Sequence, residues 1–162
     1  MFEDLHPAFL EPHNDSTITF SWADRLTKDE RRFMRSTLAK LENLLDVDFQ
    51  RVAEGGEIRF DKREDTSTPD GRPAGGWCMP YYDHNLVVLP MRPIHKDWGR
   101  YVFLHETGHA LGLGHVDNSV FDSQDTVMSY TYIGAPKYYT VNDLTRLEEI
   151  WDPITGIVND IP

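Results

Sequence analysis

Three histidines and one glutamate in a short stretch constrain this chain more than any other feature of its sequence. The stretch His105–His115 reads H-E-x-x-H-x-x-G-x-x-H. His105 and His109 are one helical turn apart, so on an α-helix their rings leave the same face. His115 can approach them only if the chain turns back, and Gly112 can adopt the positive φ that such a turn needs. The spacing therefore predicts a helix, a sharp turn and three converging imidazoles.

Three converging imidazoles are typical of a catalytic zinc site, because they leave a fourth coordination position open. Glu106 lies about 100° round the helix from His105, where it could reach a zinc-bound water without being a ligand. The alternative is an accidental motif on an ordinary amphipathic helix. Chance gives these five fixed residues in roughly one such chain in twenty thousand. The preceding apolar residues Tyr101, Val102 and Leu104 also predict a buried helix, so we expect zinc here.

Apolar periodicity predicts the remaining elements. Alternating apolar residues predict a strand over residues 16–22, and a helical stripe of leucines predicts a helix over residues 24–47. The pattern also predicts short strands over residues 48–52 and 57–61, a buried strand over residues 85–89, a helix from about Asp97 into the zinc motif, and a closing helix that begins at Thr140-x-x-Asp143.

A second motif follows the zinc motif. Thr126-Val-Met-Ser-Tyr130 matches the methionine-containing turn of the metzincin zinc endopeptidases, and with the zinc motif it makes the chain resemble that family, closest to serralysin- and matrixin-type catalytic domains. The resemblance runs from about residue 16 to residue 152. It implies an α+β fold with a twisted, mostly parallel sheet, an antiparallel edge strand, two long helices and a C-terminal helix. It also implies that Met128 forms an apolar floor beneath the zinc ligands.

The same resemblance implies a zinc-dependent endopeptidase. The three motif histidines would hold zinc, and the zinc would activate a water and polarise the peptide carbonyl. Glu106 would be the general base that takes the proton of that water and passes it to the departing amine. Tyr130 resembles the serralysin and astacin tyrosine that can also ligate zinc and then stabilise the oxyanion. The alternative for Tyr130 is a buried aromatic beneath the site.

Two segments are candidates for substrate binding. One resembles the family's edge strand, whose backbone pairs with an extended peptide; its residues are Gly76, Trp77, Cys78 and Met79. We interpret Cys78 as a partly buried free cysteine. The other segment, residues 131–140, corresponds to the wall of the pocket for the residue after the cut. Its aromatic rings, Tyr132 among them, favour a bulky hydrophobic residue there. If Lys137 points inward, it would favour an acidic residue instead.

A polar loop that begins at Asp70 resembles the matrixin calcium loop, with Asp70 as the first candidate ligand. An Asp-Gly pair in a loop is more often only a turn, but calcium and a plain turn both stay open. The chain lacks histidines around this loop, which argues against the second, structural zinc of matrixins.

The length of 162 residues predicts one domain, residues 1–162, with a core over about 16–152 and tails over 1–14 and 153–162. Sixteen basic and 27 acidic residues give a net charge of −11, which disfavours nucleic acid and membrane as partners. We expect a monomer that acts on polypeptides. Residues 1–14 lack the pattern of a signal peptide, so the expectation is a cytoplasmic protein or one exported without a cleaved leader.

Two other functions stay open at this level. The chain could be a catalytically silent, zinc-stabilised module that captures extended peptides. Glu106 argues against this, because a silent domain has no use for a general base. It could also be a peptidase of narrow specificity, such as an intracellular processing enzyme or a toxin.

Overall fold

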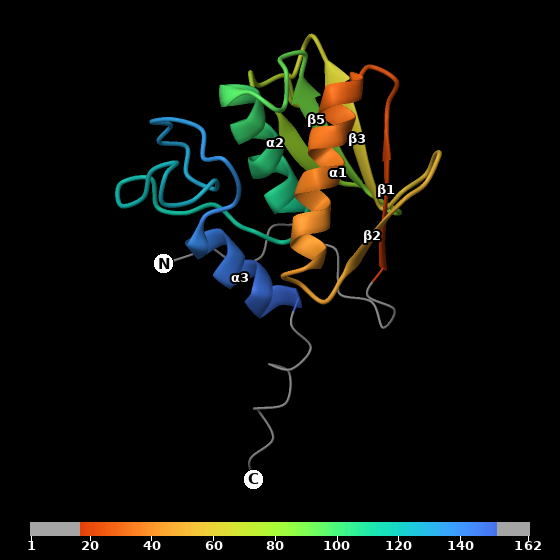
Figure 1. Ribbon diagram of the computed structural model, residues 1–162. Coiled ribbons are helices and arrows are strands. Elements are labelled where there is room, and N and C mark those ends of the chain that lie inside the picture. Colours follow the sequence, from red (N-terminus) through yellow and green to blue (C-terminus); the bar gives the residue numbers. More distant parts are fainter. Residues whose placement is uncertain (1–16, 152–162) are drawn as a thin grey trace.

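The computed structural model describes residues 17–151, so both predicted tails lie outside the described residues. Within this range the chain forms a five-stranded sheet with strand order β2-β1-β3-β5-β4, together with three helices (Figure 1). In chain order the elements are β1 Thr17–Trp22, α1 Lys28–Glu42, β2 Asp48–Arg51, β3 Ile58–Arg63, β4 Trp77–Pro80, β5 Asn85–Pro90, α2 Asp97–Ala110 and α3 Val141–Trp151.

The sheet is parallel except at one edge. β1 pairs in parallel with β2 and β3, and β3 pairs in parallel with β5. β4 runs antiparallel to β5, with Cys78 opposite Val87, and ends the sheet. Pro80 closes this strand, where a missing N–H is tolerated at an edge. This architecture confirms the predicted α+β fold, with its antiparallel edge strand and its three helices.

Helix α1 is shorter than the predicted helix over residues 24–47. It begins after Thr27, whose side chain accepts a hydrogen bond from the Glu30 N–H at 3.3 Å, while the Glu30 carboxylate accepts from the Thr27 N–H at 2.9 Å. This capping box fixes the start of the helix. At the other end, Leu45 is buried like the stripe but lies beyond Glu42, in a turn. The stripe of leucines continues past the end of the helix, so the prediction made from it was too long.

The core lies between the sheet and the two long helices. Phe103 of α2 contacts Phe33 of α1 and Phe60 of β3, with ring centroids 5.6 and 5.8 Å apart. Val87 and Leu89 of β5 are fully buried beside them. In Figure 1, α1 crosses in front of the sheet with α2 beside it. None of the helices in residues 17–151 is long and apolar enough to span a membrane.

A buried ion pair joins the sheet to the start of α1. Lys62 of β3 places its Nζ 2.6 Å from a carboxylate oxygen of Glu30, and the two side chains are 4% and 2% exposed. The same oxygen accepts the backbone N–H of Ile94 at 3.2 Å. Burial opposes the charge of Glu30, but the hydrogen bonds from Lys62, Thr27 and Ile94 together hold its pKa below the ordinary carboxyl value.

Candidate active site

Helix α2 supplies two of the three motif histidines, and the turn after it supplies the third. Gly112 has φ of 103°, which an L-residue with a side chain rarely adopts. The N–H groups of Gly112 and Leu113 donate to the carbonyls of His109 and Gly108 at 3.1 and 2.9 Å. This is a Schellman arrangement, which ends the helix and reverses the chain. The predicted turn at Gly112 is therefore confirmed, and it brings His115 back toward the helix.

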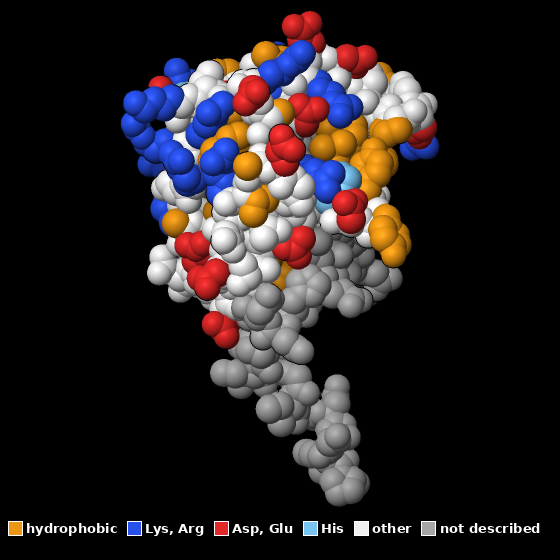
Figure 2. All heavy atoms as spheres, turned by 90° about the vertical axis from the view of Figure 1, so that its right-hand side faces the viewer, with side chains coloured by type: hydrophobic (Ala, Val, Ile, Leu, Met, Phe, Trp, Pro, Cys, Tyr) orange, Lys and Arg blue, Asp and Glu red, His pale blue; other side chains and the backbone are white. Residues whose placement is uncertain are grey.

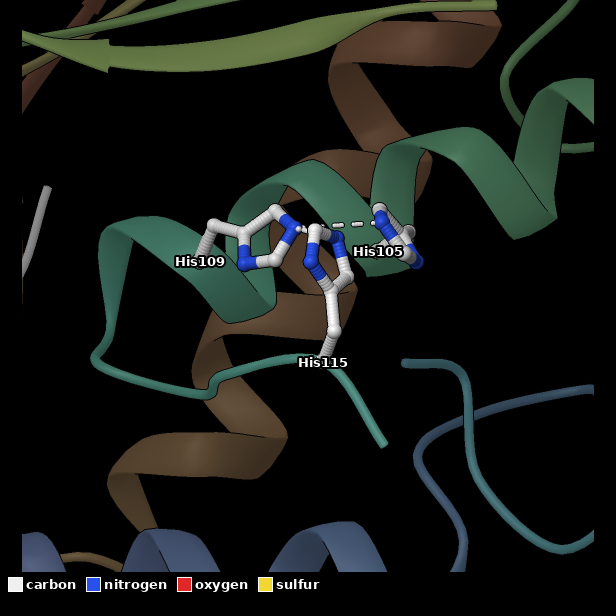
Figure 3. A group of neighbouring side chains, drawn as sticks. All are labelled: His105, His109 and His115. Carbon is white, nitrogen blue, oxygen red and sulfur yellow. Dashed lines mark hydrogen bonds between the residues drawn. The ribbon is translucent and has the colours of Figure 1, made fainter. Parts of the chain in front are cut away.

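The Nε2 atoms of the three histidines converge (Figure 3). The His109 Nε2 lies 3.1 Å from that of His105 and 2.9 Å from that of His115. The other ring nitrogens of His105 and His109 face backbone carbonyls, at 2.6 Å from Val127 and 2.8 Å from Leu113. A carbonyl can only accept, so each Nδ1 carries the proton and each Nε2 presents its lone pair to a metal.

This donor set fits zinc. The nitrogen of a neutral imidazole binds zinc at roughly 2.0–2.1 Å, so two such nitrogens in a tetrahedral shell lie a little more than 3 Å from each other. Carbonyls that accept from the far ring nitrogens are the usual support of metal-binding histidines. Within residues 17–151 the triad is the only group of His, Cys, Asp or Glu side chains found in a position to share a metal ion.

Glu106 is buried beside the triad, with 6% of the residue exposed. Burial raises its pKa to about 8, and a hydrogen bond from the backbone N–H of Cys78 opposes this rise. The carboxylate is therefore anchored to strand β4. Cys78 itself is a buried free cysteine whose thiol pKa is raised by burial and by the nearby Glu106 charge. This agrees with the interpretation of Cys78 as a free cysteine, and the raised pKa makes the reactive thiolate form rare.

Tyr130 lies over the triad. Its hydroxyl is 2.6 Å from the Nε2 of His115, and the two ring centroids are 4.5 Å apart. Its backbone N–H donates to the Asn118 side-chain carbonyl at 2.6 Å, which fixes the turn that carries the ring. Tyr130 is 60% exposed, so it is not the buried aromatic of the alternative interpretation.

The methionine-containing turn, residues 126–130 (the Met-turn), packs beneath helix α2. Met128 is 1% exposed, and its sulfur lies so close to Gly108 that a Cβ there would be 2.9 Å away. The neighbouring Val127 carbonyl accepts from His105, and the Val127 N–H donates to the Asp143 carboxylate at 3.1 Å. Asp143, at the start of α3, thus supports the turn that holds His105. The sequence identified Asp143 only as a helix cap.

A cleft of about 490 Å³ opens above the triad. Of the predicted substrate-binding residues, Gly76, Trp77, Cys78 and Tyr132 line it, together with Glu106 and Tyr130. Met79 does not line it. Lys137 also lies outside the cleft and is exposed to solvent. The backbone before it is held against α2, because Arg100 donates to the carbonyls of Ala135 and Pro136 at 3.2 and 2.8 Å.

Sequence reasoning missed three cleft residues of helix α2, Trp98, Tyr101 and Val102. They precede His105 by seven, four and three positions, so they share its face of the helix. Extending the helical spacing of the zinc motif toward the N-terminus would have found them.

The contacts of Asp70 do not support the predicted calcium site. Its carboxylate pairs with Arg72 at 2.8 Å and accepts from the Thr68 hydroxyl, and its side chain is 53% exposed. No metal-binding group found in residues 17–151 includes it. The contacts of Asp70 are those of a turn, and calcium has no support here.

A family model described as Matrixin matches residues 7–151. The chain belongs to the matrixin family. This confirms the resemblance to metzincin catalytic domains, and it makes this matrixin a zinc metallopeptidase whose substrates are polypeptides.

The fold of this matrixin is similar to that in a structure titled "Structure of myroilysin". The match has a TM-score of 0.63 at 13% sequence identity, and it covers 93% of this chain and 98% of that one. At this identity the likeness concerns the fold alone. No curated protein sequence matches the matrixin.

Proposed function

We propose that this matrixin hydrolyses internal peptide bonds of extended polypeptides, with Glu106 as the general base. The observation that carries the proposal is the convergence of three Nε2 atoms beside one buried carboxylate in a single cleft. Zinc held by these histidines would supply Lewis acidity, which activates water and polarises the substrate carbonyl. The other tasks fall to side chains of this chain.

Glu106 would accept a proton from the attacking water and deliver it to the departing amine. A base works best when its pKa lies near the working pH, and burial moves the pKa of Glu106 in that direction. The Cys78 N–H holds one side of the carboxylate, so the group has a fixed orientation. Tyr130 would assist the reaction with its hydroxyl, which lies 2.6 Å from the His115 Nε2 and could donate to the oxyanion.

Strand β4 would bind the substrate. It ends the sheet and lines the cleft with Trp77 and Cys78. An extended peptide could add to this edge as a further strand, so that backbone hydrogen bonds supply affinity without demanding a particular sequence. The same strand holds Glu106 through Cys78, so the base and the bound peptide would share one support.

The deciding experiment compares the wild type with Glu106→Gln, both loaded with one equivalent of zinc. The amide keeps an oxygen for the Cys78 N–H but cannot take a proton, so we expect wild-type zinc content and cleavage of a quenched peptide slowed by about 10²–10⁴-fold. Glu148→Gln, an exposed glutamate of α3, is the control and should retain activity. A chelator should abolish wild-type cleavage, and added zinc should restore it.

Two results would overturn the proposal. Equal cleavage by Glu106→Gln would show that another group is the base. A zinc-loaded wild type that binds extended peptides but cuts none in a whole-proteome digest would favour the silent peptide-binding module.

A further inference from the structure

A second hollow, of about 490 Å³, lies between α1 and the β2 edge of the sheet. Its lining combines apolar and basic side chains, namely Trp22, Leu26, Lys28, Arg31, Arg35 and Arg51. β2 and β4 are at opposite ends of the five-stranded sheet, so about four strand spacings of roughly 4.8 Å separate this hollow from the catalytic edge. It is therefore not part of the candidate active site.

The hollow concentrates positive charge on an acidic protein. Three guanidinium groups surround one indole ring, with Arg31, Arg35 and Arg51 at 5.9, 5.8 and 4.6 Å from the Trp22 ring centroid. Figure 2 shows Lys and Arg side chains gathered at the left of the face it presents. None of the ion pairs found in residues 17–151 involves these arginines or Lys28. Gathered like charges repel one another, and an anion placed among them would remove that cost.

One donor in this cluster is buried without an acceptor. Arg31 donates from a terminal nitrogen to the Asp24 carbonyl at 3.2 Å, but its buried Nε has no hydrogen-bond partner within residues 17–151. Leaving a charged donor unsatisfied away from water is costly. This second observation is independent of the charge count, and it concerns a residue that lines the hollow.

The arrangement selects the class of anion. Arg31 and Arg35 come from successive turns of α1, and Arg51 comes from β2, so one hollow is lined by guanidinium groups from two elements. A carboxylate offers two oxygens and one charge, whereas a phosphate monoester offers three oxygens and nearly two charges. The volume falls within the usual range of roughly 300–1,000 Å³ for small-ligand pockets, which leaves room for an organic group against Trp22 and Leu26.

We propose that this hollow binds the phosphate group of a small phosphate monoester, either free in solution or as a lipid headgroup. The three arginines hold the phosphate oxygens, and the indole and Leu26 contact the attached organic group. The site is separate from peptide hydrolysis, so it does not depend on the proposed function.

The test uses the ¹⁵N-labelled, zinc-loaded protein, titrated with inorganic phosphate and then with glycerol 3-phosphate. Chloride replaces phosphate in a parallel series of matched ionic strength. We expect saturable shifts of the Trp22 indole N–H with both phosphates and none with chloride. Trp77 and Trp98 line the catalytic cleft, so their indole signals report any phosphate bound at the metal centre instead.

Variants separate a built site from diffuse attraction. Arg35→Gln combined with Arg51→Gln should weaken phosphate binding by about tenfold or more, because charge-assisted hydrogen bonds are lost. Arg32→Gln is the matched control, since Arg32 lies on the same helix but outside the hollow, 3.9 Å from Asp29. Sedimentation with phosphatidic acid vesicles, against phosphatidylcholine vesicles, distinguishes a lipid headgroup from a free ligand.

The proposal fails if Trp22 does not respond to either phosphate and the phosphatidic acid vesicles are not bound. It also fails if chloride produces the same shifts, if only Trp77 and Trp98 respond, or if Arg32→Gln weakens binding as much as the double variant.

Discussion

The imidazole of His105 is held through one of its two ring nitrogens. Nδ1 donates to the Val127 carbonyl, and Nε2 faces the Nε2 of His109. His109 is held in the same way by the Leu113 carbonyl, and Glu106 by the Cys78 N–H. These supports are backbone groups, whose positions depend on the fold and not on the rotamer of another side chain. Rigid support of this kind would keep the proposed metal ligands and the proposed general base in a reactive geometry.

Tyr130 provides the first prediction at this scale. Tyr130→Phe removes a hydroxyl that lies 2.6 Å from the His115 Nε2 but leaves the ring, so packing should survive. We expect kcat to fall by roughly 10–10³-fold with little change in KM, as for the loss of an oxyanion donor. Steady-state kinetics on a peptide substrate measure both constants. Tyr132→Phe, in the same cleft, is the control; unchanged kcat in Tyr130→Phe would reduce Tyr130 to a structural role.

Among the elements, α3 stabilises the metal site from a distance. The Asp143 carboxylate accepts from the N–H of Thr140 at 2.9 Å and of Val127 at 3.1 Å, and from the Thr126 hydroxyl. It therefore caps its own helix and also fixes the Met-turn. Burial raises the pKa of Asp143, although these hydrogen bonds oppose the rise. The path from Asp143 through the Val127 peptide group ends at His105, one of the three histidines placed to bind a metal.

Asp143→Ala should weaken the chain of hydrogen bonds that runs from α3 through Val127 to His105. The Val127 N–H would be left unsatisfied, His105 would lose part of its support, and zinc affinity should fall by roughly tenfold or more. Competition with a chromogenic chelator measures the affinity. Asp143→Asn keeps an acceptor oxygen and should lie near the wild type. If the folded alanine variant binds zinc as the wild type does, α3 does not act on the metal site.

The ion pair between β3 and α1 concerns stability and not catalysis. Lys62→Met leaves the Glu30 charge buried without its partner, so the free energy of unfolding should fall by about 3–5 kcal/mol in urea titrations. Adding Glu30→Gln should restore much of the loss, because the uncompensated charge disappears. A double variant no more stable than the single one would contradict this.

The ion pair between Lys62 and Glu30 also determines how the stability of the folded state changes with pH. The folded state lowers the pKa of Glu30 below 4.5, so its contribution is present above that pH and is lost as the pH falls through the folded value.

At the scale of the whole molecule, the cleft combines walls from three parts of the chain. Helix α2 contributes Trp98 and Tyr101, strand β4 contributes Trp77, and the segment after the Met-turn contributes Tyr132. The rings of Tyr101 and Tyr132 lie 5.0 Å apart between centroids. The wall nearest the Met-turn is therefore aromatic, and the exposed Lys137 is not part of it.

This wall predicts cleavage before bulky hydrophobic residues. Burying a large side chain gains roughly 1.5–3 kcal/mol over a small polar one, which corresponds to roughly ten- to a hundredfold in cleavage efficiency. A peptide library profiled by mass spectrometry tests the preference. Tyr132→Ala should weaken it, and Lys137→Ala should leave it unchanged. Enrichment of Asp or Glu after the cut, erased by Lys137→Ala, would show that the lysine reaches the pocket.

Local patterns in the sequence predicted the metal site and most elements, whereas contacts between distant segments could not be predicted. The convergence of the three histidines requires only one helix and one turn at Gly112, and the structure contains both. The pairing of Lys62 with Glu30 depends on sheet and helix packing, which no periodicity describes. The exposed position of Lys137 depends on how Arg100 holds a loop far along the chain. Specificity is set by such contacts.

The turn at Gly112 also bears on how the domain folds. His115 follows His109 by only six positions, whereas Val127, which supports His105, follows it by 22. Closing a short loop costs less chain entropy than closing a long one, and local contacts form earlier during folding. We therefore expect the histidines to assemble in an early, local event, and the Met-turn to close beneath them only after the long loop has found its place. The slow step in forming the catalytic centre would then be the docking of the Met-turn beneath helix α2, and not the approach of the three histidines to one another.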